Sequence, residues 1–389
     1  MSDQKTIAPK SEMPLAMGLA FVAFTTQFGG GFASGAQIYQ YFINYGAWCL
    51  ILPLLTQGLY ALFFWYGMRY SYKHKAYDYR SFSNCFYGKY KKIMSNVYEI
   101  CYLIMIGTAS AAAFATGGST INQLLGIPYW LCTLLIAAFI FVIALFGTHL
   151  VRKVASTLSV LIICGLLLVL IPNICVQFPS IIDNIGKMMQ GHTSVLASTN
   201  PSFFGALWMA VLYFFFQLPS VSVMYQHMED VHSIKEINRS AILIFLCNFL
   251  AMELSIIGLL AVVFLPALRD ASVPMLVMVQ NGIGSFVLTP IISLLIILGS
   301  ISTAVNMISG IVTRCVNQIE KKKKVEARTH LIHNAIFTFI FTFLAFSIAQ
   351  FGLMAVVVKG YAYLGYAGCI SLFIPMLIRM LRYRGSDLR

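Results

Sequence analysis

The chain has 389 residues, of which 59% are hydrophobic and only 10% charged, and its mean hydropathy is +0.81. Soluble domains carry about 25% charged residues, so this composition excludes a soluble enzyme or binding domain and indicates an integral membrane protein. The net charge of +13 does not indicate a nucleic-acid-binding protein, because the Lys and Arg residues lie in short segments between apolar runs. Nine scattered cysteines without a C-x-x-C pair predict neither disulfides nor a metal site, and no cofactor is expected.

Ten apolar runs are long enough to cross a bilayer, and they predict an all-α membrane protein of ten transmembrane helices. Their approximate limits are 14–43, 47–68, 93–117, 128–147, 153–173, 202–227, 240–265, 286–313, 331–349 and 352–379. With both termini in the cytoplasm, all Lys and Arg residues except Lys187, Arg269 and Lys359 lie in cytoplasmic segments. That distribution obeys the positive-inside rule and predicts this orientation.

The first run contains three consecutive glycines, Gly29 to Gly31. Glycine is a poor helix former, so the helix is expected to be discontinuous here, and unpaired backbone at membrane depth is tolerated only where protein buries it or it lines a cavity. The N–H groups from Phe32 to Gly35 are predicted to face an anionic group such as a carboxylate, and the carbonyls from Thr25 to Phe28 to face a cation. Alternatively, the glycines only allow close helix packing, as small residues do in membranes.

The sixth run places polar residues and a proline behind four aromatic residues, 213–216. Pro219 cannot donate to the helix ladder and clashes with the preceding turn, so either a simple kink or a second discontinuous helix is expected. In the second case Phe216 walls a binding site, and Gln217 and Ser220 bond the substrate.

The second half of the chain echoes the first, with five runs in each half. Because five is odd, the second unit is inverted relative to the first, and paired discontinuous helices in such repeats mark a binding site at the membrane midplane. The predicted units are a first repeat at 1–173, an external connecting loop at 174–201 and a second repeat at 202–389.

The eighth run and a few charged residues are candidates for ion coupling. Hydroxyls and carbonyls around Gly299, Ser302 and Thr303 offer an oxygen-only site for sodium, although such hydroxyls more often bond their own backbone. Glu253 in the seventh run is a candidate for proton coupling, and Lys153 could replace a coupling cation. The alternatives are that Glu253 only neutralises charge in the bundle and that Lys153 is an ordinary cytoplasmic loop lysine.

The segment Gly31-Phe32-Ala33-Ser34-Gly35, followed by Gln37, Tyr41-Phe42 and Tyr45-Gly46, resembles the bacterial YkvI-like membrane proteins. Through them the chain resembles the amino acid, polyamine and organocation (APC) superfamily with its leucine-transporter (LeuT) fold. The resemblance implies alternating access, in which spans 1, 2, 6 and 7 rock against spans 3, 4, 8 and 9. It also implies a sodium site formed by the carbonyls of Thr25 and Phe28 with Gly299, Ser302 and Thr303. Phe32 and Gly35 depart from the residues that serve a second sodium site and an outer gate in the sodium symporters.

Together these patterns predict a secondary active transporter, a symporter, in the bacterial cytoplasmic membrane. Its partners are the lipid bilayer and a small organic solute, an amino acid or related carboxylate, coupled to sodium or protons. The predicted substrate-binding residues are Gly29, Gly30, Gly31, Phe32, Ser34, Gly35, Gln37, Phe216, Gln217 and Ser220. A non-transporting sensor or receptor on a transporter scaffold, or a channel, is the alternative, and no pattern determines the oligomeric state.

Overall fold

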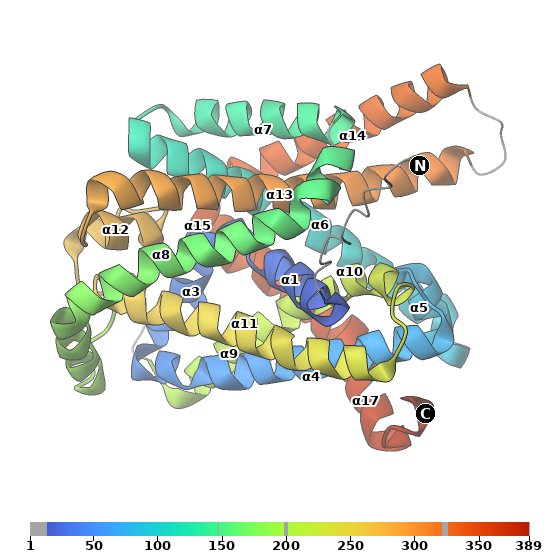
Figure 1. Ribbon diagram of the computed structural model, residues 1–389, viewed down its shortest axis with the longest axis horizontal. Coiled ribbons are helices and arrows are strands. Elements are labelled where there is room, and N and C mark those ends of the chain that lie inside the picture. Colours follow the sequence, from blue (N-terminus) through green and yellow to red (C-terminus); the bar gives the residue numbers. More distant parts are fainter. Residues whose placement is uncertain (1–13, 147, 198–200, 321–325, 389) are drawn as a thin grey trace, which may run out of the picture.

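The computed structural model describes residues 14–146, 148–197, 201–320 and 326–388, with the side chains of 146–159, 317 and 327 outside that description. Every regular element within these ranges is a helix (Figure 1). Seven helical segments in the described part are long and apolar enough to cross a membrane, and an eighth is counted if the 3₁₀ helix Ile43–Leu50 and α4 (Leu52–His74), bent by 80°, form one span. The prediction of an all-helical membrane protein is confirmed at this level.

The first predicted run is divided into three short helices, α1 (Leu15–Gln27), α2 (Gly30–Ala33) and α3 (Ala36–Tyr41). Phe28 leaves helical geometry with ψ of 47°, and Gly29 is extended with ψ of 178°. Gly35 has φ of +83°, a left-handed conformation that glycine adopts without steric cost. Two glycine positions therefore redirect the chain within this run. In Figure 1 α1 lies in the middle of the molecule, between α13 and α11.

The following elements are α5 (Tyr79–Phe86), α6 (Lys91–Leu125), α7 (Tyr129–Phe146) and α8 (Thr148–Met189). The last of these differs from the expectation that a loop begins at 174, because α8 stays helical through Pro172 and Pro179 for 42 residues. Tertiary contacts explain the continuation. Ile181 is buried, and Asn184 Nδ2 donates to the carbonyls of Leu260 and Ala261 at 2.9 and 3.2 Å, which anchors the end of α8.

The second half holds α9 (Phe203–Gln217), α10 (Val221–Tyr225), α11 (Ile234–Leu260), α12 (Pro274–Gln280), α13 (Ser285–Glu320) and α14 (Ala327–Ala349). The break expected near Gln217 is one 3₁₀ turn, Leu218–Ser220, and the segment from Phe203 to Met228 remains helical. Pro219 is the second residue of this turn, and its missing N–H leaves the carbonyl four residues earlier, that of Phe215, without its usual helical donor. The sixth run is therefore tightened rather than unwound.

The last segment combines α15 (Leu353–Ala355), α16 (Tyr361–Gly368) and α17 (Ile374–Tyr383) with two π-helical stretches, Val356–Gly360 and Cys369–Phe373. A π-turn leaves a carbonyl without its usual donor and is frequent at functional sites. Here tyrosines from other elements supply the donors: Tyr41 Oη donates to the Val357 carbonyl at 3.1 Å, and Tyr87 Oη donates to that of Ser371. The irregular last segment is thus attached to α3 and to the turn after α5.

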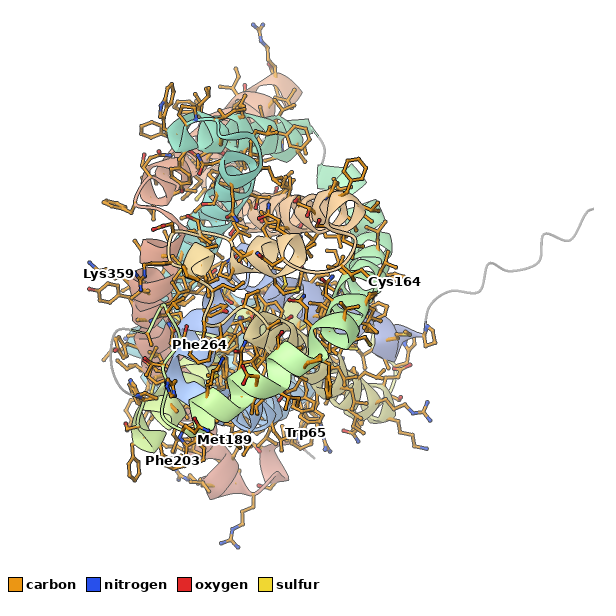
Figure 2. The ribbon with its side chains drawn as sticks, turned by 90° about the vertical axis from the view of Figure 1, so that its left-hand side faces the viewer. Trp65, Cys164, Met189, Phe203, Phe264 and Lys359 are labelled. Carbon is orange, nitrogen blue, oxygen red and sulfur yellow. The ribbon has the colours of Figure 1, made fainter. Side chains whose placement is uncertain are left out.

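Aromatic side chains fill the interior, and large apolar side chains also cover the outside. The fully buried residues include Tyr39, Tyr60, Phe24 and Phe64. Figure 2 shows side chains standing outward around the molecule, among them Met189 and Phe203, which are 73% and 42% exposed. An apolar surface of this extent indicates contact with lipid.

Candidate functional site

The end of α1 leaves carbonyl groups free of its helical ladder. The Phe28 N–H donates to the Phe24 carbonyl at 2.7 Å, and this is the last bond of α1. The carbonyls from Thr25 to Phe28 therefore lie beyond the ladder, as the last carbonyls of a helix do. These carbonyls are the groups that the predicted cation would use, and the cation itself stays a prediction.

The other side of the break differs from the prediction. The chain returns to helix at once, and the N–H groups of Phe32 and Ala33 both donate to the Gly29 carbonyl at 3.0 Å. The N–H groups of Ser34 and Gly35 donate to Gly30 and Phe32. The N–H groups from Phe32 to Gly35 are therefore occupied by backbone acceptors and are not free to bind a carboxylate in this conformation.

The three consecutive glycines permit three different close approaches. A Cβ added at Gly30 would lie 2.6 Å from Thr116 Oγ1 and 3.0 Å from the Ala112 carbonyl oxygen of α6. A Cβ at Gly31 would lie 2.7 Å from Gln37 Nε2, whereas one at Gly29 would lie 3.5 Å from the Thr303 methyl carbon. Close packing thus explains the presence of glycine at positions 30 and 31, which is the alternative explanation given for the three glycines.

Ser34 and Gly35 serve a contact with α12 instead of facing the cavity. The Ser34 carbonyl accepts a hydrogen bond from Met275 N at 3.0 Å, and Ser34 Oγ donates to the Gly31 carbonyl at 3.0 Å. A Cβ at Gly35 would lie 3.3 Å from Met275 N. These two positions therefore connect the interrupted run to α12.

A cavity of about 30 Å³ lies between α1, α3, α6, the α9 end, α13 and α16. At roughly 10–15 Å³ for each water, it holds about two water molecules, so a larger solute needs side chains to move. The lining includes six predicted residues, Gly29, Gln37, Phe216, Gln217, Ser220 and Thr303. It does not include Gly30, Gly31, Phe32, Ser34, Gly35, Thr25, Phe28, Gly299 or Ser302.

Seven other lining residues are not among the predicted site residues: Thr26, Gln27, Met105, Ala109, Met307, Tyr361 and Leu364. Gln27 carried a signal, because an amide inside an apolar run beside three glycines is costly unless it is bonded or functional. Met105 and Ala109 of α6 and Leu364 of α16 are apolar residues in apolar runs. Only the packing of these helices shows that they face the cavity.

Three glutamines line the cavity, and Tyr213 behind them contacts two of their amides. Gln27 Nε2 and Gln217 Nε2 each donate to Tyr213 Oη at 3.3 Å. The carbonyl oxygens Oε1 of Gln27 and Gln37 are buried and have no hydrogen-bond partner among the described residues. Among the described residues that line the cavity, none is charged.

The proposed cation residues lie partly together. A Cβ added at Gly299 would lie 3.7 Å from the Phe28 carbonyl oxygen, and Thr303 contacts the position of Gly29. Thr303 Oγ1 donates to the Gly299 carbonyl at 2.9 Å, as hydroxyls in membrane helices usually do, and keeps its lone pairs. Thr25 Oγ1 also donates to the carbonyl four residues earlier, that of Phe21, at 2.9 Å, and the predicted ligand from Thr25 is its own backbone carbonyl. Ser302 is partly buried beside Thr303.

Of the two candidates for proton coupling, Glu253 is not among the described residues that line the cavity. Glu253 is a partly buried residue of α11. Lys153 falls in α8 at a position whose side chain is outside the described residues.

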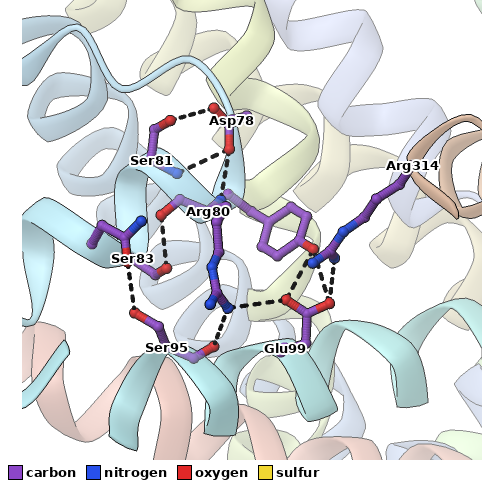
Figure 3. Close-up of polar contacts among 9 residues, drawn as sticks. Asp78, Arg80, Ser81, Ser83, Ser95, Glu99 and Arg314 are labelled. Atoms are coloured by element: carbon purple, nitrogen blue, oxygen red, sulfur yellow. Dashed lines mark hydrogen bonds and ion pairs between the residues drawn. The ribbon is translucent and has the colours of Figure 1, made fainter. Parts of the chain in front are cut away.

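Glu99 is the centre of a separate polar cluster (Figure 3). Its carboxylate pairs with Arg80 of α5 at 3.3 Å and with Arg314 of α13, and it accepts hydrogen bonds from Tyr79 Oη at 3.1 Å. The Arg314 guanidinium also lies 4.5 Å from the centre of the Tyr79 ring. The cluster joins α5, α6 and α13, so Glu99 is paired rather than a lone charge in the membrane.

Similar proteins were sought by family model, by sequence and by structure. No family model matches the chain, and no curated protein matches it in sequence. Among solved structures, a substrate-bound, outward-open Na⁺-coupled sialic acid symporter matches with a TM-score of 0.60 at 13% identity, covering 95% of this chain and 89% of that one. A mutant of the Eremococcus coleocola manganese transporter matches with a TM-score of 0.59 at 14% identity, covering 98% of this chain and 82% of that one. At such low identity these likenesses show a shared fold: the chain has the architecture of solved membrane transporters.

Proposed function

We propose that this chain is a secondary active transporter of a small organic solute, an amino acid or related carboxylate, rather than an enzyme. The observation that carries the proposal is the uncharged polar cavity beside the interrupted α1, in a chain that shares the fold of solved transporters. Cavities formed by interrupted helices are where such folds bind solute and ion. The cavity draws residues from α1 and α3 in the first half of the chain and from α9, α13 and α16 in the second.

The finer architecture belongs to the same proposal. The chain forms ten spans as a five-plus-five inverted repeat, with units at 1–173 and 202–389 joined at 174–201, in the cytoplasmic membrane of a bacterium. Solute binds along Gly29, Gln37, Phe216, Gln217 and Ser220, and a coupling ion, sodium or a proton, is used to drive uptake. The cavity is lined by both amide and hydroxyl side chains, and this supports a small polar solute.

Uptake into proteoliposomes tests this function. The purified chain is reconstituted, a sodium or proton gradient is imposed, and accumulation of labelled amino acids and small carboxylates is measured. Accumulation that saturates and exchanges with internal solute is expected. If no solute accumulates under either gradient and none binds, the transporter proposal is wrong. Flux that neither saturates nor exchanges would favour the channel, and binding without flux would favour the sensor.

Thr303→Ala is expected to weaken sodium dependence. Removing Oγ1 deletes one oxygen beside Phe28 and Gly29, and losing one such contact raises the sodium concentration for half-maximal uptake by about tenfold. The matched control is Ser293→Ala, which removes a hydroxyl on the same helix that donates to the Thr289 carbonyl at 2.6 Å. An unchanged sodium response in Thr303→Ala removes the proposed ion site.

Glu253→Gln separates proton coupling from sodium coupling. If Glu253 carries the coupling proton, the amide cannot bind and release it, so uptake driven by a pH gradient is lost while sodium-driven uptake remains. Glu229→Gln at an exposed position serves as the control. Equal pH-driven uptake in the wild type and in Glu253→Gln would show that Glu253 only balances charge within the protein.

A further inference from the structure

Tyr213 lies behind the cavity wall, where it contacts two of the lining glutamines. It is fully buried, and its hydroxyl oxygen accepts hydrogen bonds from Gln27 of α1 and from Gln217 at the end of α9, each at 3.3 Å. The two donors are 190 residues apart (27 and 217) and come from the two halves of the chain. One phenol therefore holds two amide groups that face the same cavity.

Because Tyr213 accepts from the NH₂ groups of both glutamines, the carbonyl end of each amide is the end that points away from the phenol. An amide has a donor end and an acceptor end on opposite sides of its carbon. With the NH₂ ends on Tyr213, the carbonyl ends are directed away from the phenol. Gln27 is 3% exposed and its Oε1 has no partner among the described residues.

Gln37 adds a second unpartnered oxygen to the same cavity. It is 2% exposed, and its Oε1 also lacks a partner among the described residues. Its amide fits against Gly31, where a Cβ would lie 2.7 Å from Nε2, so the absence of a side chain at Gly31 leaves room for this group. A buried polar group without a hydrogen bond is costly, so these two oxygens are acceptors for water or for a solute that displaces it from the cavity.

We infer that Tyr213 is a positioning residue: it orients the glutamine amides of this cavity wall so that their carbonyl oxygens bind the hydrogen-bond-donating end of the solute. This inference rests on the proposed function and deepens it. The chemistry recognised is an N–H or O–H donor, an ammonium or a hydroxyl group, and a carboxylate is not recognised by this wall. No charged residue among those lining the cavity competes with these oxygens for the donor.

The ring of Tyr213 is held in place independently of the hydrogen bonds. It packs edge-on against Tyr41, Phe42 and Phe216, with ring centroids 5.8, 5.2 and 4.7 Å away. Phenylalanine at this position keeps these contacts and removes only the oxygen. Tyr213→Phe therefore isolates the effect of the shared acceptor.

The test measures ligand-induced shifts in the melting temperature of the full-length protein in detergent, with propylamine, 1-propanol and propionate as probes. Wild-type protein is expected to be stabilised more strongly by a donor probe than by propionate, and the stronger of propylamine and 1-propanol identifies the donor. In Tyr213→Phe the donor probe is expected to bind about tenfold more weakly, because the amides are no longer oriented.

Tyr41→Phe is the matched control, because it also removes one buried tyrosine hydroxyl, which donates to the Val357 carbonyl and not to the cavity. It should lower the melting temperature without changing the order of the probes. Gln27→Met keeps side-chain volume while removing the oxygen, and it should reproduce the loss of donor preference even if Tyr213→Phe does not fold.

Three results would overturn the inference: propionate stabilises the wild type as well as the donor probes, Tyr213→Phe and Gln27→Met keep the wild-type preference, or no probe shifts the melting temperature. None of these three results tests transport itself, which the uptake assay in proteoliposomes measures separately. Uptake of labelled solute that persists in such a case would show that the chain transports but recognises its solute through other groups.

Discussion

Replacing Gly30 with alanine is expected to lower the free energy of unfolding by about 1–3 kcal/mol, the usual cost of overpacking, and to reduce uptake. The added Cβ would meet Thr116 Oγ1 at 2.6 Å, Thr116 Cβ at 2.9 Å and the Ala112 carbonyl at 3.0 Å. The Ala112 atom is backbone in the middle of α6 and cannot rotate away. The break between α1 and α2 must therefore move away from α6, which displaces Gly29 and Gln27 at the cavity. Thermal unfolding in detergent and uptake in proteoliposomes measure the two effects.

Gly18→Ala is the control for this substitution. Gly18 lies in α1, and a Cβ there meets nothing within 4 Å. Alanine at this position is expected to stabilise the helix slightly through its better propensity. Adding Thr116→Ala to Gly30→Ala removes the nearest atom and should restore part of the loss. Equal tolerance of alanine at positions 18 and 30 would contradict the close approach of α2 to α6.

Replacing Glu99 with glutamine is expected to cost roughly 2 kcal/mol of stability. The carboxylate balances two arginines, Arg80 and Arg314, which are 45% and 34% exposed, and its loss leaves two like charges close together. Their partial exposure keeps the cost below that of a fully buried broken pair. The loss should also shrink at high salt, because screening weakens the repulsion between the arginines. Thermal unfolding at low and high salt measures both effects.

The cluster around Glu99 also holds α5 in place. Phe82 of α5 stacks on Tyr225 of α10 with ring centroids 4.2 Å apart, so α5 connects the Glu99 cluster with α10. Asp183→Asn is the control, because it breaks an exposed pair with Lys187 within one helix and should cost at most about 0.5 kcal/mol. A stability loss for Glu99→Gln no larger than that of the control would show that the cluster adds nothing to the fold.

The sequence predicted the membrane class and the interruption of the first run because both follow from local chemistry. A charged fraction of 10% cannot solvate a protein surface in water, and three glycines disfavour helix wherever they occur. The same reasoning was wrong about the groups that the break exposes. Of the three glycines only Gly29 lies outside helix, because α2 starts at Gly30. The carbonyls of Gly29, Gly30 and Phe32 accept from the N–H groups that were expected to bind a carboxylate.

The proline signal in the sixth run shows a second limit. A proline removes one donor and clashes with the preceding turn, but a 3₁₀ turn accommodates it without unwinding the chain. Likewise α8 remains helical past two prolines because Asn184 finds acceptors at the end of α11. The acceptors of Asn184 lie on another segment of the chain and leave no trace in the sequence around the two prolines of α8.

The sequence by itself determined that the chain spans a membrane, that its first run is interrupted at Gly29, and that Gln217 and Thr303 are polar residues in apolar surroundings. Only the tertiary structure decided which polar groups share a cavity. Gln27, Gln37 and Gln217 come together because α1, α3 and α9 meet. The bond from Gln217 to Tyr213 joins residues four apart on α9, as spacing along one helix allows, but the bond from Gln27 to Tyr213 joins two helices and exists only because they pack together. Hydrogen bonds between helices depend on distance in space, and no spacing along the chain encodes that distance.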